Sequence, residues 1–85
     1  MAGLEAELDL HTFLPKECAD VVEEYVRAAH EEGRALVRII HGKGVGTLRT
    51  ITHAVLARHP AVASFELAGP NWGATVVTLK ARDAG

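Results

Sequence analysis

The chain has 85 residues, enough for a single small domain with a modest core, and 48% of them are hydrophobic, as in a compact globular fold. No apolar stretch is long enough to cross a membrane, the first residues lack a secretory signal, and one cysteine cannot form an internal disulfide, so we expect a reducing, cytoplasmic setting. Taken over the whole chain, the net charge of -2 argues against a nucleic-acid partner, but the two halves of the chain differ in charge.

The first predicted elements are a strand and a helix. Apolar and polar residues alternate over residues 8–11, which indicates a short strand. Pro15 fits the first turn of a helix, and Gly33 fits the position just after its C-terminal end. The apolar face between them has helical spacing and comprises Cys18, Val22, Tyr25, Val26 and Ala29.

A second strand is predicted at residues 36–40, followed by a second helix. Thr47 is a candidate N-cap for this helix, and Pro60 lies beyond its end. Its apolar stripe comprises Leu48, Ile51, Val55 and Leu56. Two further strands are predicted at residues 62–67 and 74–79.

The order of the predicted elements is β-α-β-α-β-β, which defines an α/β fold with a mixed, mostly parallel four-stranded sheet and two helices. Helical crossovers join parallel strands, so the first three strands should run parallel and the fourth antiparallel. His11, His41 and the Trp72-Gly73 pair would then share the carboxyl edge of the sheet, where open α/β sheets bind ligands. If the first two strands are neighbours, about 4.8 Å apart, His11 and His41 could share one phosphate.

The strand at residues 36–40 leads through His41 into a glycine-rich turn before the second helix. Glycines let a backbone approach an anion, and the free N–H groups at a helix start point at it. His41 adds a group that exchanges protons near neutral pH. The pattern predicts a phosphate site, and the residues of the turn that we expect to hold the phosphate are Gly42, Lys43, Gly44 and Gly46.

Positive charge gathers in the half of the chain that contains this turn. Residues 1–35 carry nine acidic and three basic residues, a net charge of -6, whereas residues 36–85 carry two acidic and six basic residues, a net charge of +4. This asymmetry suits a local phosphate site.

The glycine turn does not match the common nucleotide-binding loops. Gly44 follows Lys43 where a Walker A loop needs Ser or Thr, and Val37 stands where its first glycine should be. Gly44 and Gly46 are spaced too closely for a dinucleotide fingerprint. We therefore expect neither ATP nor NAD. The alternative to an anion site is a tight turn that needs glycine only for its positive φ.

Asp9 and His11 would share one face of the first predicted strand. His11 could shuttle a proton or meet a metal, and Asp9 could orient His11, activate water or hold a divalent ion such as Mg or Mn. The alternative is an exposed polar face on an edge strand. Alone, the Asp9-x-His11 pattern favours the exposed polar face; with His41 at the same edge, the catalytic interpretation becomes equally well supported.

Three more residues are candidates for contact with nucleic acid. Arg49 and His53 lie four apart on the second helix, and both could reach a phosphate backbone or could simply form a solvated face. Trp72 could stack on a base or pack over the end of the sheet.

Three segments together resemble the Smr (small MutS-related) domain family. They are Leu8-Asp9-Leu10-His11, then Ile39-Ile40-His41-Gly42-Lys43-Gly44 with Gly46-Thr47-Leu48-Arg49, and then Trp72-Gly73-Ala74-Thr75-Val76-Val77. The resemblance implies a free-standing domain over residues 8–80, flanked by tails at 1–7 and 81–85. It also implies a two-layer sandwich like the C-terminal domain of bacterial translation initiation factor three.

The resemblance further implies nucleic-acid binding and, as in several family members, endonuclease activity. The residues at the family's active positions are Asp9, His11, His41, Gly42, Lys43 and Gly44. Two positions depart from the family pattern: Thr12 stands where glycine is usual, and Pro70-Asn71 stand where a glycine pair is usual.

Our main hypothesis is an endonuclease that nicks or cleaves DNA or RNA phosphodiesters, with Asp9, His11 and His41 as catalytic residues. Their individual roles stay open at this point. One alternative is a non-catalytic module that binds RNA or branched DNA through the same anion site, and a second is a phosphoesterase for small nucleotides. No cofactor is certain, although Mg or Mn is compatible with Asp9.

Overall fold

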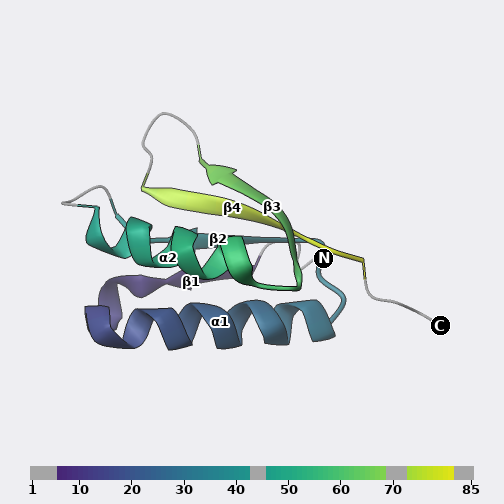
Figure 1. Cartoon of the computed structure of the whole chain (residues 1–85), viewed down its shortest axis with the longest axis horizontal. Coiled ribbons are helices and arrows are strands. Elements are labelled where there is room, and N and C mark those ends of the chain that lie inside the picture. Colours follow the sequence, from purple (N-terminus) through teal and green to yellow (C-terminus); the bar gives the residue numbers. More distant parts are fainter. Residues whose placement is uncertain (1–5, 43–45, 69–72, 82–85) are drawn as a thin grey trace.

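The computed structural model of the chain describes residues 6–42, 46–68 and 73–81 (Figure 1). The strands are β1 (Ala6–Asp9), β2 (Leu36–Ile40), β3 (Val62–Leu67) and β4 (Ala74–Leu79), and the helices are α1 (Pro15–Glu31) and α2 (Thr47–Arg58). A short 3-10 helix, η1 (Leu10–Thr12), follows β1. The predicted order of strands and helices is thus confirmed. β1 includes residues 6 and 7, which the sequence analysis assigned to an N-terminal tail.

The strands form one sheet in the order β1-β2-β4-β3. β1 pairs with β2 in parallel, and β4 is antiparallel to both β2 and β3, so the first three strands run in one direction as predicted. The sequence did not indicate that β4 would insert between β2 and β3. This insertion brings the start of β4 beside the end of β2, where Ile40 pairs with Ala74.

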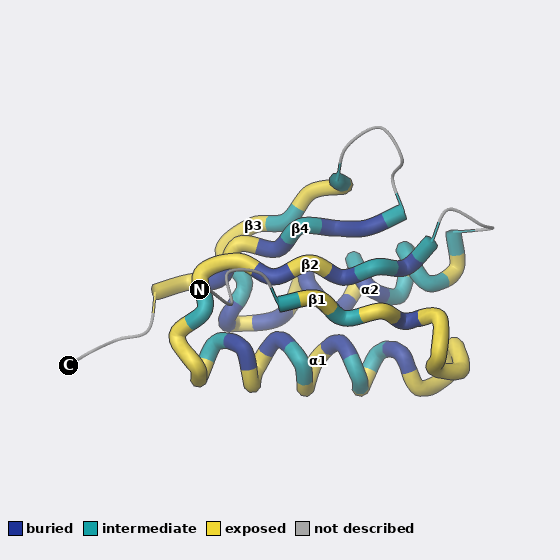
Figure 2. The backbone as a smooth tube through the Cα atoms, turned by 180° about the vertical axis from the view of Figure 1, so that it is seen from behind, coloured by how far each residue is buried: buried dark blue, intermediate teal, exposed yellow. Residues whose placement is uncertain are grey.

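The two helices pack side by side against one face of the sheet (Figure 1). The buried positions of α1 lie on the side that faces the sheet (Figure 2). The core between the layers contains Leu10, Val22, Val26, Val37, Ile39, Leu56 and Val77. These are the apolar positions that alternate along strands and recur at helical spacing. Neither α1 nor α2 is long and apolar enough to span a bilayer.

The ends of the helices follow from local chemistry. Pro15 is the first residue of α1, and the Glu17 carboxylate accepts a hydrogen bond from the Leu14 N–H at 3.1 Å. Gly33 follows the end of α1 with a φ of 82°, as predicted for a helix-terminating glycine. The prediction that Thr47 caps α2 was wrong. Gly46 is the N-cap, with a left-handed φ of 85°, and Thr47 is the first helical residue.

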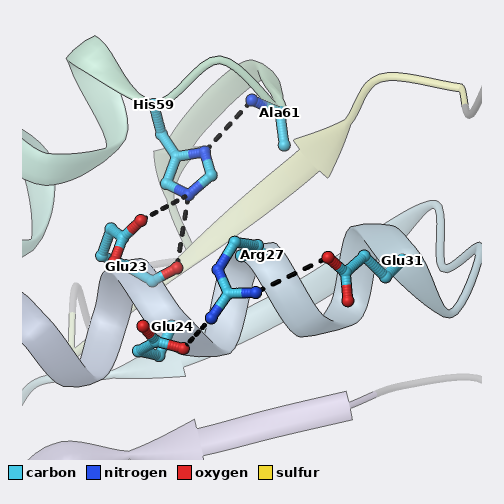
Figure 3. Close-up of polar contacts among 6 residues, drawn as sticks. All are labelled: Glu23, Glu24, Arg27, Glu31, His59 and Ala61. Atoms are coloured by element: carbon cyan, nitrogen blue, oxygen red, sulfur yellow. Dashed lines mark hydrogen bonds and ion pairs between the residues drawn. The ribbon is translucent and has the colours of Figure 1, made fainter.

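The C-terminal end of α2 is attached to α1 through His59 (Figure 3). The His59 ring accepts a hydrogen bond from the Ala61 N–H at Nδ1, at 3.1 Å, and its Nε2 lies 3.3 Å from the carbonyl oxygen of Glu23. Because Nδ1 is an acceptor, the ring proton is on Nε2, which donates to Glu23. His59 is buried, so these bonds satisfy both of its ring nitrogens. On the exposed side of α1, Arg27 pairs with Glu24 and Glu31.

Candidate active site

The first strand ends at Asp9, and the chain then turns instead of continuing to His11. One carboxylate oxygen of Asp9 (Oδ1) accepts a hydrogen bond from the His11 N–H at 2.9 Å and so caps η1. Leu10 is fully buried at this turn. The prediction that Asp9 and His11 share a strand face was therefore wrong, because a side-chain cap replaces the next step of the strand.

The turn nevertheless brings the two side chains together. Nδ1 of His11 lies 2.8 Å from the same Oδ1 atom of Asp9. A carboxylate holds the proton of a neutral imidazole on the nitrogen that faces it, so Nδ1 carries the proton and Nε2 keeps its lone pair. Both side chains are more than half exposed, at 57% for His11 and 55% for Asp9. The pair is thus open to a ligand.

The end of β2 is joined to the start of β4 through one carbonyl group. The N–H groups of His41 and Gly42 both donate to the carbonyl oxygen of Gly73, at 2.9 and 2.8 Å. The Gly42 N–H is therefore not one of the free donors that we expected to face a phosphate. Gly42 instead lets the His11 ring approach the backbone closely. Its φ is 81°, and a Cβ at this position would lie 2.7 Å from Nε2 of His11.

The ring of His41 is buried among protein atoms. Only 4% of the residue is exposed, and its Nδ1 lies 3.2 Å from the carbonyl oxygen of Gly42. Its Nε2 lies 2.8 Å from the hydroxyl oxygen of Thr75, on β4. Both ring nitrogens are thus engaged, whereas His11 is exposed.

A third histidine, His53 of α2, shares the same hydroxyl group. Its Nε2 lies 2.7 Å from Oγ1 of Thr75, and its ring packs edge-on to His41 with 6.0 Å between ring centroids. Its other contact is the ring of Phe65 on β3, at 5.0 Å. His53 therefore lies between α2 and the sheet, and its Nε2 is directed at Thr75 rather than at a nucleic-acid backbone or at solvent.

Burial and nearby positive charge keep these two histidines neutral. Desolvation is the largest effect on the pKa of His41 and lowers it; the hydrogen bond to the Gly42 carbonyl opposes this, and Arg49 and His11 lower the pKa by smaller amounts. Desolvation also lowers the pKa of His53, with added contributions from His41 and Arg49. The Arg49 guanidinium reaches back over the start of α2, where a Cβ on Gly46 would lie 3.1 Å from its Nη2 atom.

The sequence predicted that His11, His41 and Gly73 lie at one edge of the sheet, and the structure brings them together there. Thr75 was not among the predicted site residues. The residues brought together there are Asp9, His11, His41, Gly42, Gly46, Arg49, His53 and Gly73. Lys43, Gly44 and Trp72 lie outside the described residues. Thr75 carried one sequence signal, a polar residue at an inward-facing position of an apolar strand, and it is fully buried.

The sequence did not decide whether the site binds a metal ion. Within residues 6–42, 46–68 and 73–81, no three His, Cys, Asp or Glu side chains gather as ligands. Asp9 is instead paired with His11.

Comparison with known sequences places the chain among similar domains. The sequence pattern of the Smr domain matches residues 8–80. The chain is 43% identical over 76 residues to "Endonuclease MutS2" of Thermomicrobium roseum, a match that covers 89% of the chain and 10% of that protein. It is 41% identical over 82 residues to "Endonuclease MutS2" of Ruminiclostridium cellulolyticum, covering 92% of the chain and 10% of that protein. The chain thus spans about a tenth of the length of these relatives.

Two solved structures share the fold. The Smr domain of Thermus thermophilus MutS2 superimposes with a TM-score of 0.83 at 35% identity, covering 88% of this chain and 98% of that one. YdaL, a stand-alone small MutS-related protein of Escherichia coli, also gives a TM-score of 0.83, at 28% identity, covering 92% of this chain and 69% of that one.

Proposed function

Because the chain belongs to the Smr domain family, we propose that it binds nucleic acid and cleaves phosphodiester bonds at the edge where β1 and β2 end. Two relatives named endonucleases support this proposal, since about a tenth of their length matches about nine-tenths of the chain. The family resemblance does not assign a role to each residue, and the geometry of the edge supports that part of the proposal.

The observation that carries the proposal is the pairing of Asp9 with His11. An exposed imidazole with its proton held on Nδ1 presents the Nε2 lone pair as a general base. His11 would take a proton from the attacking water or hydroxyl group and return it to the leaving oxygen. Asp9 would hold the ring in the correct tautomer and stabilise the imidazolium that forms.

The two catalytic histidines expected from the sequence then have different roles. His41 is buried and both of its ring nitrogens contact protein atoms, so we assign it to the support of the turn. His11 is the group that meets the substrate. Gly42 lets these two parts of the edge approach each other, since it has no side chain to separate them.

Binding of the phosphate would rest on the positive charge around this edge. Arg49 lies at the start of α2, beside Gly46, and can pair with phosphate oxygens. Lys43 and Gly44 follow Gly42 in the sequence and lie outside the described residues, so their phosphate contacts stay predictions, as does the stacking of Trp72 on a base. A divalent ion bound to the substrate is compatible with Asp9.

The test is cleavage of supercoiled plasmid and of single-stranded RNA by the parent protein, with and without Mg²⁺ or Mn²⁺. The variant is His11→Asn, and the matched control is His30→Asn, at the far end of α1. Loss of cutting in His11→Asn alone supports the proposal and excludes a contaminating nuclease. Equal cutting by both variants removes His11 from the mechanism. A salt-sensitive gel shift without any cutting identifies the chain as a binding module.

A further inference from the structure

Thr75 lies fully buried between two histidine rings of different elements. Its Oγ1 is 2.8 Å from Nε2 of His41, which follows β2, and 2.7 Å from Nε2 of His53, on α2. A threonine hydroxyl has one proton to donate and lone pairs to accept. It can therefore donate to only one of the two rings.

The Gly42 carbonyl decides which ring receives the proton. A carbonyl oxygen only accepts, so the His41 nitrogen that contacts it, Nδ1, carries the His41 ring proton. Nε2 of neutral His41 then has a lone pair and accepts the Thr75 proton. The Thr75 oxygen in turn accepts from His53, whose proton is on Nε2.

We propose that Thr75 is a positioning residue of the site. Its hydroxyl donates to Nε2 of His41 and orients the ring that the Gly42 carbonyl holds as the Nδ1–H tautomer, and it accepts from His53 and so fixes that ring as the Nε2–H tautomer. With its tautomer fixed, His41 donates to the carbonyl of Gly42 and holds that turn against His11. This role deepens the proposed cleavage function and rests on it, whereas the two tautomers can be measured without any substrate.

The hydrogen-bonded array of His41, Thr75 and His53 also couples the two rings to each other. Adding a proton to Nε2 of His41 would turn this atom into a donor, so the Thr75 proton would lose its acceptor on His41. The Thr75 proton finds an acceptor on His53 only if His53 moves its own proton from Nε2 to Nδ1. A change at either ring is thus transmitted through one hydroxyl, and removal of that hydroxyl separates them.

Three substitutions on β4 separate this role from simple packing. Thr75→Val keeps the shape and removes the hydroxyl, Thr75→Ser keeps the hydroxyl, and Thr78→Val is a matched control at an exposed position of the same strand. The first readout is ¹⁵N NMR of the histidine rings at a pH where they are neutral. The second is the rate of plasmid or RNA cleavage under single-turnover and steady-state conditions.

We expect the parent, Thr75→Ser and Thr78→Val to show His41 as Nδ1–H and His53 as Nε2–H. In Thr75→Val the His53 ring should lose its preference for the Nε2–H form because its acceptor is gone, whereas His41, still bonded to the Gly42 carbonyl, should keep the Nδ1–H form. We expect kcat to fall about tenfold with little change in KM, the kinetic equivalent of one lost hydrogen bond. Thr75→Ser should restore kcat to within about threefold of the parent value.

Several results would overturn the proposal. A parent protein with His41 as Nε2–H contradicts the proton assignment. An unchanged His53 tautomer in Thr75→Val, whatever happens to kcat, reduces Thr75 to a packing residue. If Thr75→Val does not fold, the parent spectrum and Thr75→Ser still decide. If the parent does not cleave, the proposed function fails, while the tautomers alone decide whether the array exists.

Discussion

Nε2 of His11 lies 2.7 Å from the point where a Cβ at position 42 would stand, so Gly42 and His11 meet without room for a side chain between them. The contact joins η1 to the end of β2, two segments about thirty residues apart. The contact places the exposed His11 ring, which is paired with Asp9, directly beside Gly42, whose carbonyl oxygen is bonded to the His41 ring.

Gly42→Ala should therefore damage both stability and cleavage. The left-handed φ of 81° costs an L-residue about 1–2 kcal/mol, and the added Cβ must also displace the His11 ring. We expect urea denaturation to show a loss of about that size, and cleavage to fall well below what the remaining folded fraction explains.

Gly33→Ala provides the matched control for this prediction. Gly33 has almost the same φ, 82°, and a Cβ added there, at the end of α1, would meet nothing within 4 Å. The variant should lose similar stability, about 1–2 kcal/mol, and keep full cleavage per folded molecule. An equal loss of cleavage in both variants would show that backbone strain, and not the approach to His11, explains the effect.

Asp9→Asn should reduce catalysis far more than stability. The Asp9–His11 pair is more than half exposed, so it contributes at most about 1 kcal/mol to the free energy of unfolding. Loss of the carboxylate frees the His11 tautomer and removes the charge that stabilises its imidazolium, and we expect kcat to fall about 10²- to 10⁴-fold. Asp20→Asn, at an exposed position of α1, should leave kcat unchanged. Wild-type cleavage by Asp9→Asn would refute the assigned role of this pair.

The stability of the domain should fall as the solution becomes acidic. The pKa values of His41 and His53 are lowered in the folded protein from their usual 6.5, mainly by burial. As the pH falls below about 6.5, the unfolded chain binds protons at these rings before the folded chain does. Stability is therefore complete above this pH and is lost as the pH falls toward the folded pKa values, by at most about 1.4 kcal/mol per pH unit for each ring.

Urea denaturation between pH 7.5 and pH 5 measures this slope. His53→Gln removes one of the two rings and should make the dependence on pH shallower, whereas His30→Gln, on the last turn of α1, should leave it unchanged. A parent protein whose free energy of unfolding is constant over this range would contradict the prediction.

His59→Ala should destabilise the domain without affecting cleavage. The buried ring connects the end of α2 to the Glu23 carbonyl, and its removal leaves that carbonyl and the Ala61 N–H without these partners (Figure 3). We expect a loss of about 1–3 kcal/mol. Cleavage measured well below the melting temperature should match the parent, because His59 lies at the opposite end of α2 from Arg49. A large loss of activity in the folded variant would show that this end of the domain takes part in function.

The sequence predicted the elements well where one regular pattern extends over several residues. The ranges 36–40, 62–67 and 74–79 match β2, β3 and β4, because alternation and apolar runs record which side of a strand is buried. The start of α1 at Pro15 and its end before Gly33 were equally clear, since proline and glycine act through their own backbone preferences.

The rest depended on contacts that a linear pattern does not contain. β1 stops at Asp9 because its side chain caps the following turn, which competes with continuation of the strand. Gly46 replaces Thr47 as the cap of α2 because the chain arrives there with a left-handed φ. Thr75 lies in the site, and His53 contacts it, because β4 inserts beside β2, and no local pattern specifies that pairing.

β4 is the last of the four strands to be synthesised, yet it occupies the place between β2 and β3. A growing polypeptide must therefore keep both of those strands with an open edge until residues 74–79 have left the ribosome. Gly73 and Thr75 arrive with the same segment, and with them the partners of His41 and His53. Completion of the sheet and the fixing of the His41 and His53 rings are then a single event, so an incomplete chain would hold these two histidines without their partners.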